Sequence, residues 1–239
     1  MRVLCIMLFM FLYLPNAFSD TWVSSDSTVS IGKVVVNGQD LSRLGNSLTG
    51  SGIKKTISRN ITNFRSINSS GAFDIIYKQG EASLIITGDD NIIDAVVTNI
   101  VDHTLKISIN RSYSSKLPIE LEVSSPAIET ITINGASNVK LKSIKLPSLM
   151  VNLSGSADLS ANGEVSRLEL NINGTGDVRI KSLISDFVTV KAQGAADVQL
   201  TARKELNARV SGTGDVVFYG HPEKVTKKTL GLGDIVAAE

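Results

Sequence analysis

The sequence predicts an all-β chain folded as a single-domain β-solenoid, a β-helix-like fold with about 19–20 residues and two short strands in each coil. Three observations predict this fold. Aromatic residues make up only 5% of the chain, whereas Gly, Ser, Thr, Asn, Val and Ile are frequent, as is typical of strands and turns. A glycine turn recurs at a nearly constant period. Aliphatic residues alternate with other residues on both sides of that turn.

Residues 1–19 have the features of a signal peptide. Arg2 supplies a positive charge, residues 3–14 are apolar, and Ala17 and Ser19 are small residues at the recognition positions. We expect cleavage after Ser19, because the alternative, an uncleaved membrane anchor, needs about 20 apolar residues. Cys5 lies within the apolar run, so the mature chain would be an exported protein without disulfide or thiol chemistry.

Residues 20–56 are rich in Ser, Gly and Asn and are predicted to form a linker with an extra strand or hairpin. Residues 31–36 read as that strand and are followed by Asn37 and Gly38, a turn signal. An alternative is that this segment caps the exposed edge of the first coil. The solenoid domain is then expected to span residues 57–239.

Six turns of one type follow in phase. In each, a glycine accepts the φ > 0 of a tight turn, and an Asp or Asn three residues later can bond nearby backbone N–H groups. The first glycines are 20, 19, 20, 18 and 19 residues apart. We interpret these residues as a structural turn ladder: Gly135 and Asn138, Gly155 and Asp158, Gly174 and Asp177, Gly194 and Asp197, Gly212 and Asp215, and Gly231 and Asp234.

Around these glycines, alternate residues are aliphatic and are expected to point inward. Stacked coils would place equivalent strands about 4.8 Å apart and join their apolar faces into one core. A β-sandwich also has short strands, but it gives no reason for one turn chemistry to recur in register. The predicted inward residues are Val139, Leu141, Leu149, Val151, Leu153, Leu159, Ala161, Leu168, Leu170, Ile172, Val178, Ile180, Val188, Val190, Ala192, Val198, Leu200, Val216, Phe218, Ile235 and Ala237.

The ladder would bring five carboxylates and Asn138 into one column. Such a column could bind calcium, or turn amides could satisfy it. The calcium-binding nonapeptide pattern has half this period in an acidic chain, and neither condition is met here. We therefore favour the structural interpretation and predict no metal site and no cofactor.

Catalytic chemistry has few candidate groups. The chain has two histidines, His103 and His221, each most simply placed in a turn or loop, and it has no Gly-x-Ser-x-Gly motif. We predict no catalytic residue, although a carboxylate pair of a polysaccharide-cleaving solenoid stays an alternative. With a net charge of +1, nucleic acid is not an expected partner.

One outward face of the predicted strands is polar and mixed in charge. It is either a solvated surface or a flat contact surface for a partner. Sugar stacking would need exposed aromatic residues, and we count only Tyr77, Tyr113, Phe218 and Tyr219 near the coils. The polar face comprises Thr130, Thr132, Asn152, Glu169, Asn171, Thr189, Lys191, Asn207 and Arg209.

Residues 57–239 resemble a bacterial family described as the putative auto-transporter adhesin, head GIN domain. The resemblance rests on the Ser-Gly-x-Gly-Asp turns and on ITNFRSI at 61–67, SGAFDI at 70–75, DDNII at 89–93, TLKI at 104–107, LPIELEV at 117–123 and PAIETI at 126–131. The chain departs from the family pattern at Asn138 and in the last coil, where Lys227 and Thr229 replace inward aliphatic residues and fraying is expected. The resemblance implies an exported β-solenoid with an adhesive role.

We therefore expect an exported, non-catalytic β-solenoid that presents its surface to an envelope protein or a glycan. Its compartment would be the periplasm, the outer membrane surface or the medium, and the mature chain is not expected to insert into a membrane. One alternative is a structural element that self-assembles through the solenoid edges. A polysaccharide-active enzyme is the other alternative.

Overall fold

The computed structural model describes residues 35–36, 39–40 and 47–238. The chain divides into two compact units, Met1–Ser47 and Leu48–Glu239. The predicted signal peptide lies outside the described residues and stays a prediction. In the first unit, β1 (Val35–Val36) pairs antiparallel with β2 (Gln39–Asp40), on either side of the expected turn at residues 37–38.

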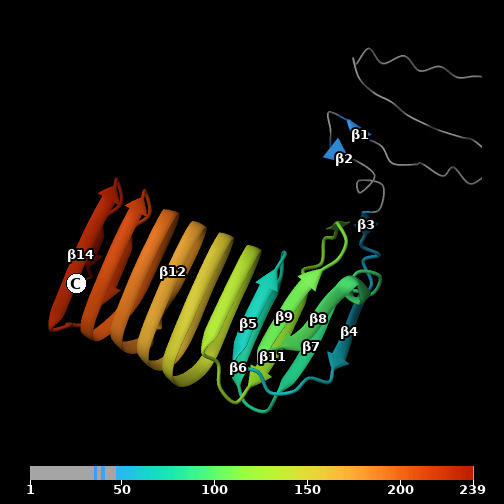
Figure 1. Ribbon diagram of the computed structural model, residues 1–239, viewed down its shortest axis with the longest axis horizontal. Helices are drawn as coiled ribbons and strands as arrows, with labels where there is room; N and C mark the ends of the chain where they lie inside the picture. Colours follow the sequence, from blue (N-terminus) through green and yellow to red (C-terminus); the bar gives the residue numbers. More distant parts are fainter. Residues whose placement is uncertain (1–34, 37–38, 41–46, 239) are drawn as a thin grey trace, which may run out of the picture. The chain divides into compact units, whose positions relative to one another are not determined.

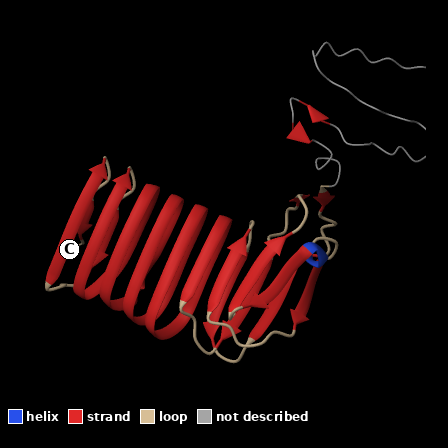
Figure 2. Ribbon diagram, viewed as in Figure 1, coloured by secondary structure: helices blue, strands red, loops and turns tan. Residues whose placement is uncertain are grey.

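The second unit is all-β, as predicted, and its described residues hold one short 3₁₀ helix and no α-helix (Figures 1 and 2). Its main sheet is open, in the order β4-β7-β11-β6-β12-β5-β9-β8, and β13, β14 and β15 extend it from β12. The elements are β3 (Leu48–Thr49), β4 (Lys54–Arg59), β5 (Ser66–Ser70), β6 (Asp74–Gln79), β7 (Ser83–Asp89), η2 (Ile93–Ala95), β8 (Val96–Val101), β9 (Thr104–Ile109), β10 (Tyr113–Ser114), β11 (Glu120–Ser125), β12 (Thr130–Gly212), β13 (Val216–Tyr219), β14 (Lys224–Gly231) and β15 (Ile235–Ala237).

The 83-residue β12 runs as successive parallel bands, which lie side by side in Figure 1. Its ladders to neighbouring strands are all parallel: its first part pairs with β5 and β6, and its last part with β13 and β14. Val198 lies opposite Val216 and Leu206 opposite Val225, so residues about one sequence repeat apart are neighbours in the sheet. We call each such stretch a repeat.

Residues 80–129 depart from the two-strand repeat that the sequence predicts. Here β7 pairs antiparallel with β4 and β11, and β8 pairs antiparallel with β9. Asp102 and His103 join β8 to β9 with φ values of 48° and 57°. Two positive φ values in a two-residue loop are the signature of a tight hairpin, which forces antiparallel pairing.

The start of the second unit lies inside the stretch that the sequence predicts as a linker. β3 pairs in parallel with β10, and β4 begins at Lys54 and pairs with β7 along its whole length. The segment from Leu48 therefore adds strands to the sheet. Whether residues 20–47 act as a tether or as a cap stays a prediction.

Aliphatic side chains from alternate positions of the strands form the core. Every inward residue predicted from Val139 to Ile235 is buried, which confirms the period-two pattern in this region. Burial of each large aliphatic side chain contributes about 1.5–3 kcal/mol relative to exposure. Ala237 is exposed, contrary to prediction, because β15 is the last strand and has a neighbour on one side only.

Tyr77 is the largest fully buried side chain of this core. Its hydroxyl donates a hydrogen bond to the carbonyl oxygen of Ser125 at 2.9 Å. Burial raises the pKa of Tyr77 to about 12 because it disfavours the phenolate. Tyr77 is thus a core residue and offers no exposed ring for sugar stacking.

Candidate functional site

The predicted ladder glycines lie one behind another at a corner of successive repeats. A Cβ placed on Gly155 would lie 2.6 Å from the carbonyl oxygen of Gly135, and one on Gly174 would lie 2.1 Å from that of Gly155. A Cβ placed on Gly194, Gly212 or Gly231 would come similarly close to the carbonyl oxygen of the preceding ladder glycine. Such short approaches leave no room for a side chain at these corners.

The column has a member that sequence reasoning missed. A Cβ on Gly135 would lie 2.2 Å from the carbonyl oxygen of Gly71. Asp74, three residues after Gly71, pairs with Asn138 in the ladder between β6 and β12. Residues 70–74 have the Ser-Gly-x-x-Asp form that recurs at 154–158 and 211–215, but the strands inserted between the first turn and the later ones break the period.

The Asp column lies beside the glycines, and three of its members hold the backbone of the next repeat. Asp158 Oδ1 accepts a hydrogen bond from the N–H of Asp177 at 2.8 Å. Asp197 Oδ1 accepts from Asp215 at 3.0 Å, and Asp215 Oδ1 accepts from Asp234 at 2.8 Å. Each carboxylate thus supplies an acceptor to a backbone donor where the chain turns.

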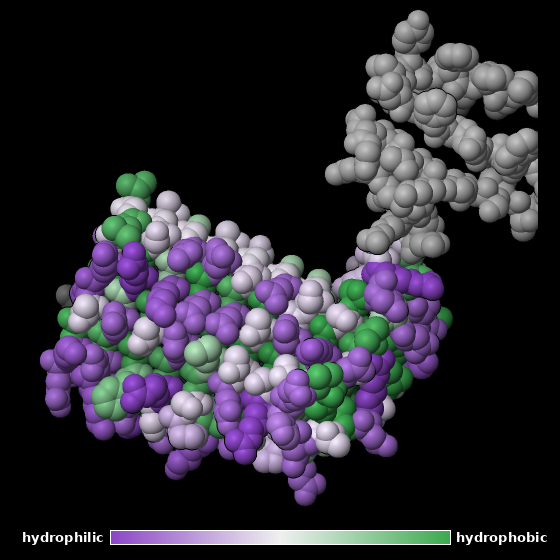
Figure 3. All heavy atoms as spheres, in the orientation of Figure 1, coloured by the Kyte–Doolittle hydropathy of each residue, from purple (hydrophilic) through white to green (hydrophobic). Residues whose placement is uncertain are grey.

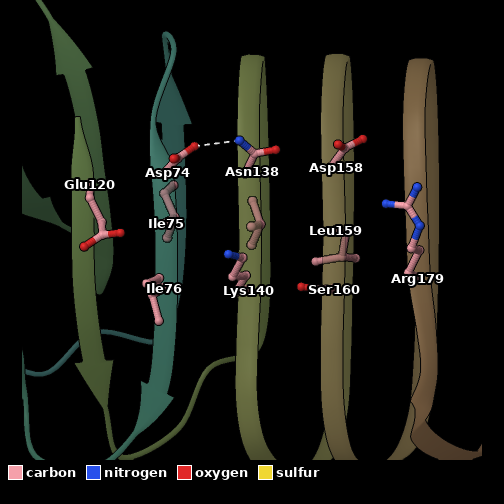
Figure 4. Close-up of a pocket in the computed structure, with 11 residues that line it drawn as sticks. Asp74, Ile75, Ile76, Glu120, Asn138, Lys140, Asp158, Leu159, Ser160 and Arg179 are labelled. Carbon is pink, nitrogen blue, oxygen red and sulfur yellow. Dashed lines mark hydrogen bonds between the residues drawn. The ribbon is translucent and has the colours of Figure 1, made fainter. Parts of the chain in front are cut away.

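Asn138 takes the place that Asp has in the other repeats. Its Nδ2 donates to Asp74 Oδ1 at 2.7 Å, a bond that Asp at this position could make only when protonated (Figure 4). The two residues line an open hollow of about 340 Å³, with Glu120 and Asp158 beside them. Arg179 lies at its rim and pairs with Asp177, so the charges of the hollow are mixed.

The hollow contains the carboxylates of Asp74, Glu120 and Asp158 but no histidine. Among the described residues, no three His, Cys, Asp or Glu side chains converge in a way that could hold a metal ion. His103 lies in the β8–β9 turn and His221 in the loop between β13 and β14, both exposed. Neither histidine lines the hollow.

Asp89 is a buried carboxylate that sequence reasoning did not single out. It is 1% exposed and accepts hydrogen bonds from the N–H of Gly52, at 2.7 Å, and from the hydroxyl of Ser115. These bonds tie two loops to the end of β7, so Asp89 has a structural role.

The polar face lies on the outward side of the strands that precede the glycine corners, and none of its predicted residues is buried. An amide ladder crosses it: Asn171 Nδ2 donates to Asn152 Oδ1 at 2.9 Å, and Asn152 Nδ2 donates to Thr132 at 3.3 Å. Lys191 pairs with Glu169 at 3.1 Å. Its hydrogen bond holds the pKa of Glu169 below the usual value.

The polar face includes one aromatic residue that the sequence analysis did not identify. Phe187 is half-buried, and its ring has the guanidinium of Arg167 at 5.3 Å and the ammonium of Lys204 at 5.7 Å from its centroid. It lies two residues before Thr189 on the same strand, so alternation alone assigns it to the outward side.

The other predicted aromatic residues occupy different places. Phe218 is buried, as its predicted inward position requires, whereas Tyr219 is half-buried with Lys181 at 3.9 Å from its centroid. Tyr113 packs partly against the core, and its hydroxyl donates to the carbonyl oxygen of Ala72. Burial raises the pKa of Tyr113. On the side in view, the surface over the stacked strands is mostly hydrophilic (Figure 3).

Known proteins resemble this chain in sequence and in fold. The profile of the family described as "Putative auto-transporter adhesin, head GIN domain" matches residues 63–222. No protein of curated function matches the chain. No helix among the described residues is long and apolar enough to cross a membrane.

Two crystal structures share the fold. One, described as a putative adhesin from Bacteroides fragilis, matches with a TM-score of 0.66 and 20% identity over 80% of this chain and 100% of that one. The other, described as a putative lipid binding protein from Parabacteroides distasonis, matches with a TM-score of 0.51 and 18% identity over 81% of this chain and 100% of that one. At these identities the likeness concerns the fold.

Proposed function

Because the chain belongs to the family described as "Putative auto-transporter adhesin, head GIN domain", we propose that it is a non-catalytic binding module exported to the bacterial envelope. The observation that carries this proposal is the polar face. Its side chains stand outward from strands whose inward neighbours are buried, so the face is held by the core beneath it. Such a surface suits contact with a partner.

The proposal includes a β-solenoid as the supporting scaffold. The parallel ladders from β12 to β13 and β14 support this, as does the approach of each corner glycine to the preceding one. A stack of equivalent repeats presents equivalent outward positions in straight rows. The amide ladder through Asn152 and Asn171 is one such row.

The partner we propose is an envelope protein or a glycan, met in the periplasm, at the outer membrane or outside the cell. Hydrogen-bonding groups of both kinds, amide and hydroxyl, line the face, and it carries charges of both signs, with Glu169 paired to Lys191. Phe187 between two cations adds an apolar surface for stacking or packing. A face of this composition favours a polar, uncharged or mixed-charge partner over a polyanion.

Binding to bacterial envelopes tests the proposal. The purified chain is incubated with envelope fractions and with intact cells, and the bound fraction is measured against protein concentration. Asn171→Arg places a long charged side chain in the middle of the polar face, where it breaks the contact with Asn152. Gln199→Arg makes the same change at an exposed outward position beyond a glycine corner and is the matched control.

We expect N171R to weaken binding at least about tenfold, or about 1.4 kcal/mol, and Q199R to leave it unchanged. Equal binding by both variants, with unchanged circular dichroism, would contradict the assignment of the polar face. Failure of the wild-type chain to bind any fraction would contradict the binding function. Release of reducing ends from a polysaccharide panel would point to an enzyme.

A further inference from the structure

One row of outward side chains crosses the strands of the polar face and reaches β14. It consists of the third residue before each ladder glycine, and because each of these glycines approaches the preceding one, the row residues are neighbours on adjacent strands. The hydrogen bonds from Asn171 to Asn152 and from Asn152 to Thr132 run along it. We call it the polar row: Thr132, Asn152, Asn171, Lys191, Arg209 and Lys228.

The polar row changes its chemistry halfway, since its first three residues are uncharged and its last three are cations. Lys191 pairs with Glu169, whereas Arg209 and Lys228 form no ion pair with a carboxylate of the described residues. Arg209 lies directly opposite Lys228 in the ladder between β12 and β14. Like charges directly opposite each other destabilise a strand pair, so a bound anion would relieve this contact. Local conflicts of this kind are expected at functional sites.

A hollow of about 260 Å³ lies in the cationic half of the row, between Lys191 and Arg209. Gln193 and Ser211, each the residue directly before a ladder glycine, complete its polar lining. All four side chains offer N–H or O–H donors, and no carboxylate of the described residues lines the hollow. Charged donors without a competing carboxylate suit an anionic group, because hydrogen bonds between ionised partners are the stronger ones.

The uncharged half of the row keeps hydrogen-bonding groups free. An Asn amide has two N–H donors and an oxygen with two lone pairs. Asn152 gives one N–H to Thr132 and accepts one bond from Asn171, so one donor and one lone pair stay open along the row. Donors and acceptors side by side match the hydroxyl groups of a sugar, since each hydroxyl both donates and accepts.

We propose that the polar row binds an acidic glycan, with neutral sugar residues on its uncharged half and a carboxylate or phosphate group in the hollow between Lys191 and Arg209. This inference rests on the proposed function and names its partner. A protein partner fits less well, because the row has no aromatic or aliphatic side chain to fill a pocket of that partner. A dense polyanion fits less well too, because half of the row carries no charge to match it.

Binding of the full chain to protease-treated envelope polysaccharide tests this inference. The carboxylates of one portion are reduced to alcohols, a second portion is hydrolysed to remove its phosphate groups, and a third receives neither treatment. We expect the third portion to bind, and at least one of the two chemical treatments to weaken binding at least about tenfold. The treatment that weakens binding identifies the anionic group as carboxylate or phosphate.

Variants at Arg209 connect this loss to the hollow. Arg209→Gln should weaken binding to the polysaccharide with intact anionic groups at least about tenfold, and the chemical treatment should then cause little further loss. Arg209→Lys keeps the charge and should recover most of the affinity. Lys142→Gln makes the same change in net charge at an exposed outward position beyond a glycine corner, and this matched control should bind as the wild type does.

The outcomes separate this inference from the proposed function. Loss of binding on protease treatment alone would show a protein partner and overturn the inference, while the proposed function would stand. Binding that neither chemical treatment weakens, wild-type binding by R209Q with unchanged circular dichroism, or equal losses in R209Q and K142Q would overturn the inference as well. Failure of the wild-type chain to bind any untreated envelope fraction would instead contradict the binding function itself.

Discussion

Replacing Gly174 by alanine probes the stacked glycine corners most directly. Gly174 has φ of 143°, and the added Cβ would lie 2.1 Å from the carbonyl oxygen of Gly155 and 3.0 Å from its nitrogen. Holding alanine in this region of φ costs about 1–3 kcal/mol. Forcing two packed repeats apart costs about 1–3 kcal/mol more. We expect G174A to lower the free energy of unfolding by about 2–6 kcal/mol.

Two other glycines separate the two contributions. Gly52 has φ of 79° with no atom within 4 Å of the added Cβ, so G52A should show backbone strain alone, about 1–2 kcal/mol. Gly80 has neither a positive φ nor a neighbour within 4 Å. G80A should therefore change the free energy of unfolding by less than about 0.5 kcal/mol.

Urea unfolding followed by far-ultraviolet circular dichroism measures all three variants. Equal slopes against urea concentration would show that only the free energy changes. The expected order of stability is G80A, then G52A, then G174A. If G174A unfolds at the same urea concentration as G80A, the repeats do not meet at the glycine corners and the reasoning on the fold is refuted.

Two further predictions concern polar groups of the repeats. Asp215→Ala removes the acceptor of the Asp234 N–H and should lower the free energy of unfolding in urea by about 1 kcal/mol. Asp215→Asn keeps a side-chain oxygen, so its free energy of unfolding should lie nearer that of the wild type. Equal losses in the two variants would contradict the assigned hydrogen bond. Because the hydrogen bond from Lys191 lowers the pKa of Glu169, that pair should stabilise the fold fully above the ordinary Glu value of 4.5 and lose its contribution as pH falls through the lowered pKa. Carbon-detected NMR titration of the Glu169 carboxyl should show this lowered pKa, and Lys191→Met should raise it; an unchanged titration in K191M would show that Lys191 is not the cause.

Local alternation and period predicted the regular part of the fold well. The inward residues between Val139 and Ile235 could be identified because a half-buried strand has a side-chain period of two, and a single glycine register fixes its phase. The same rule assigns Phe187 to the polar face. It was missed because it stands at the start of its strand, two residues before the polar stretch that begins at Thr189.

The sequence was less informative where long-range pairing decides the structure. β5 pairs with both β9 and β12, and β6 with both β11 and β12, so the first repeat is completed by segments far away in the chain. No sequence periodicity indicates such pairing, because the paired strands do not belong to equivalent repeats. The link between Gly71 and Gly135 is hidden for the same reason: the inserted strands separate two corners that touch.

Each regular repeat pairs only with the repeats directly before and after it. This arrangement determines where the fold opens first. The C-terminal repeat has one neighbour, and all eight residues of β14 are exposed, so it opens at the lowest free energy. Opening can then travel inward one repeat at a time, as in a one-dimensional chain of coupled units. At the other end, strands from distant segments interlock and must open together. Amide exchange is therefore graded along the stack, fastest at β14 and slowest near β6.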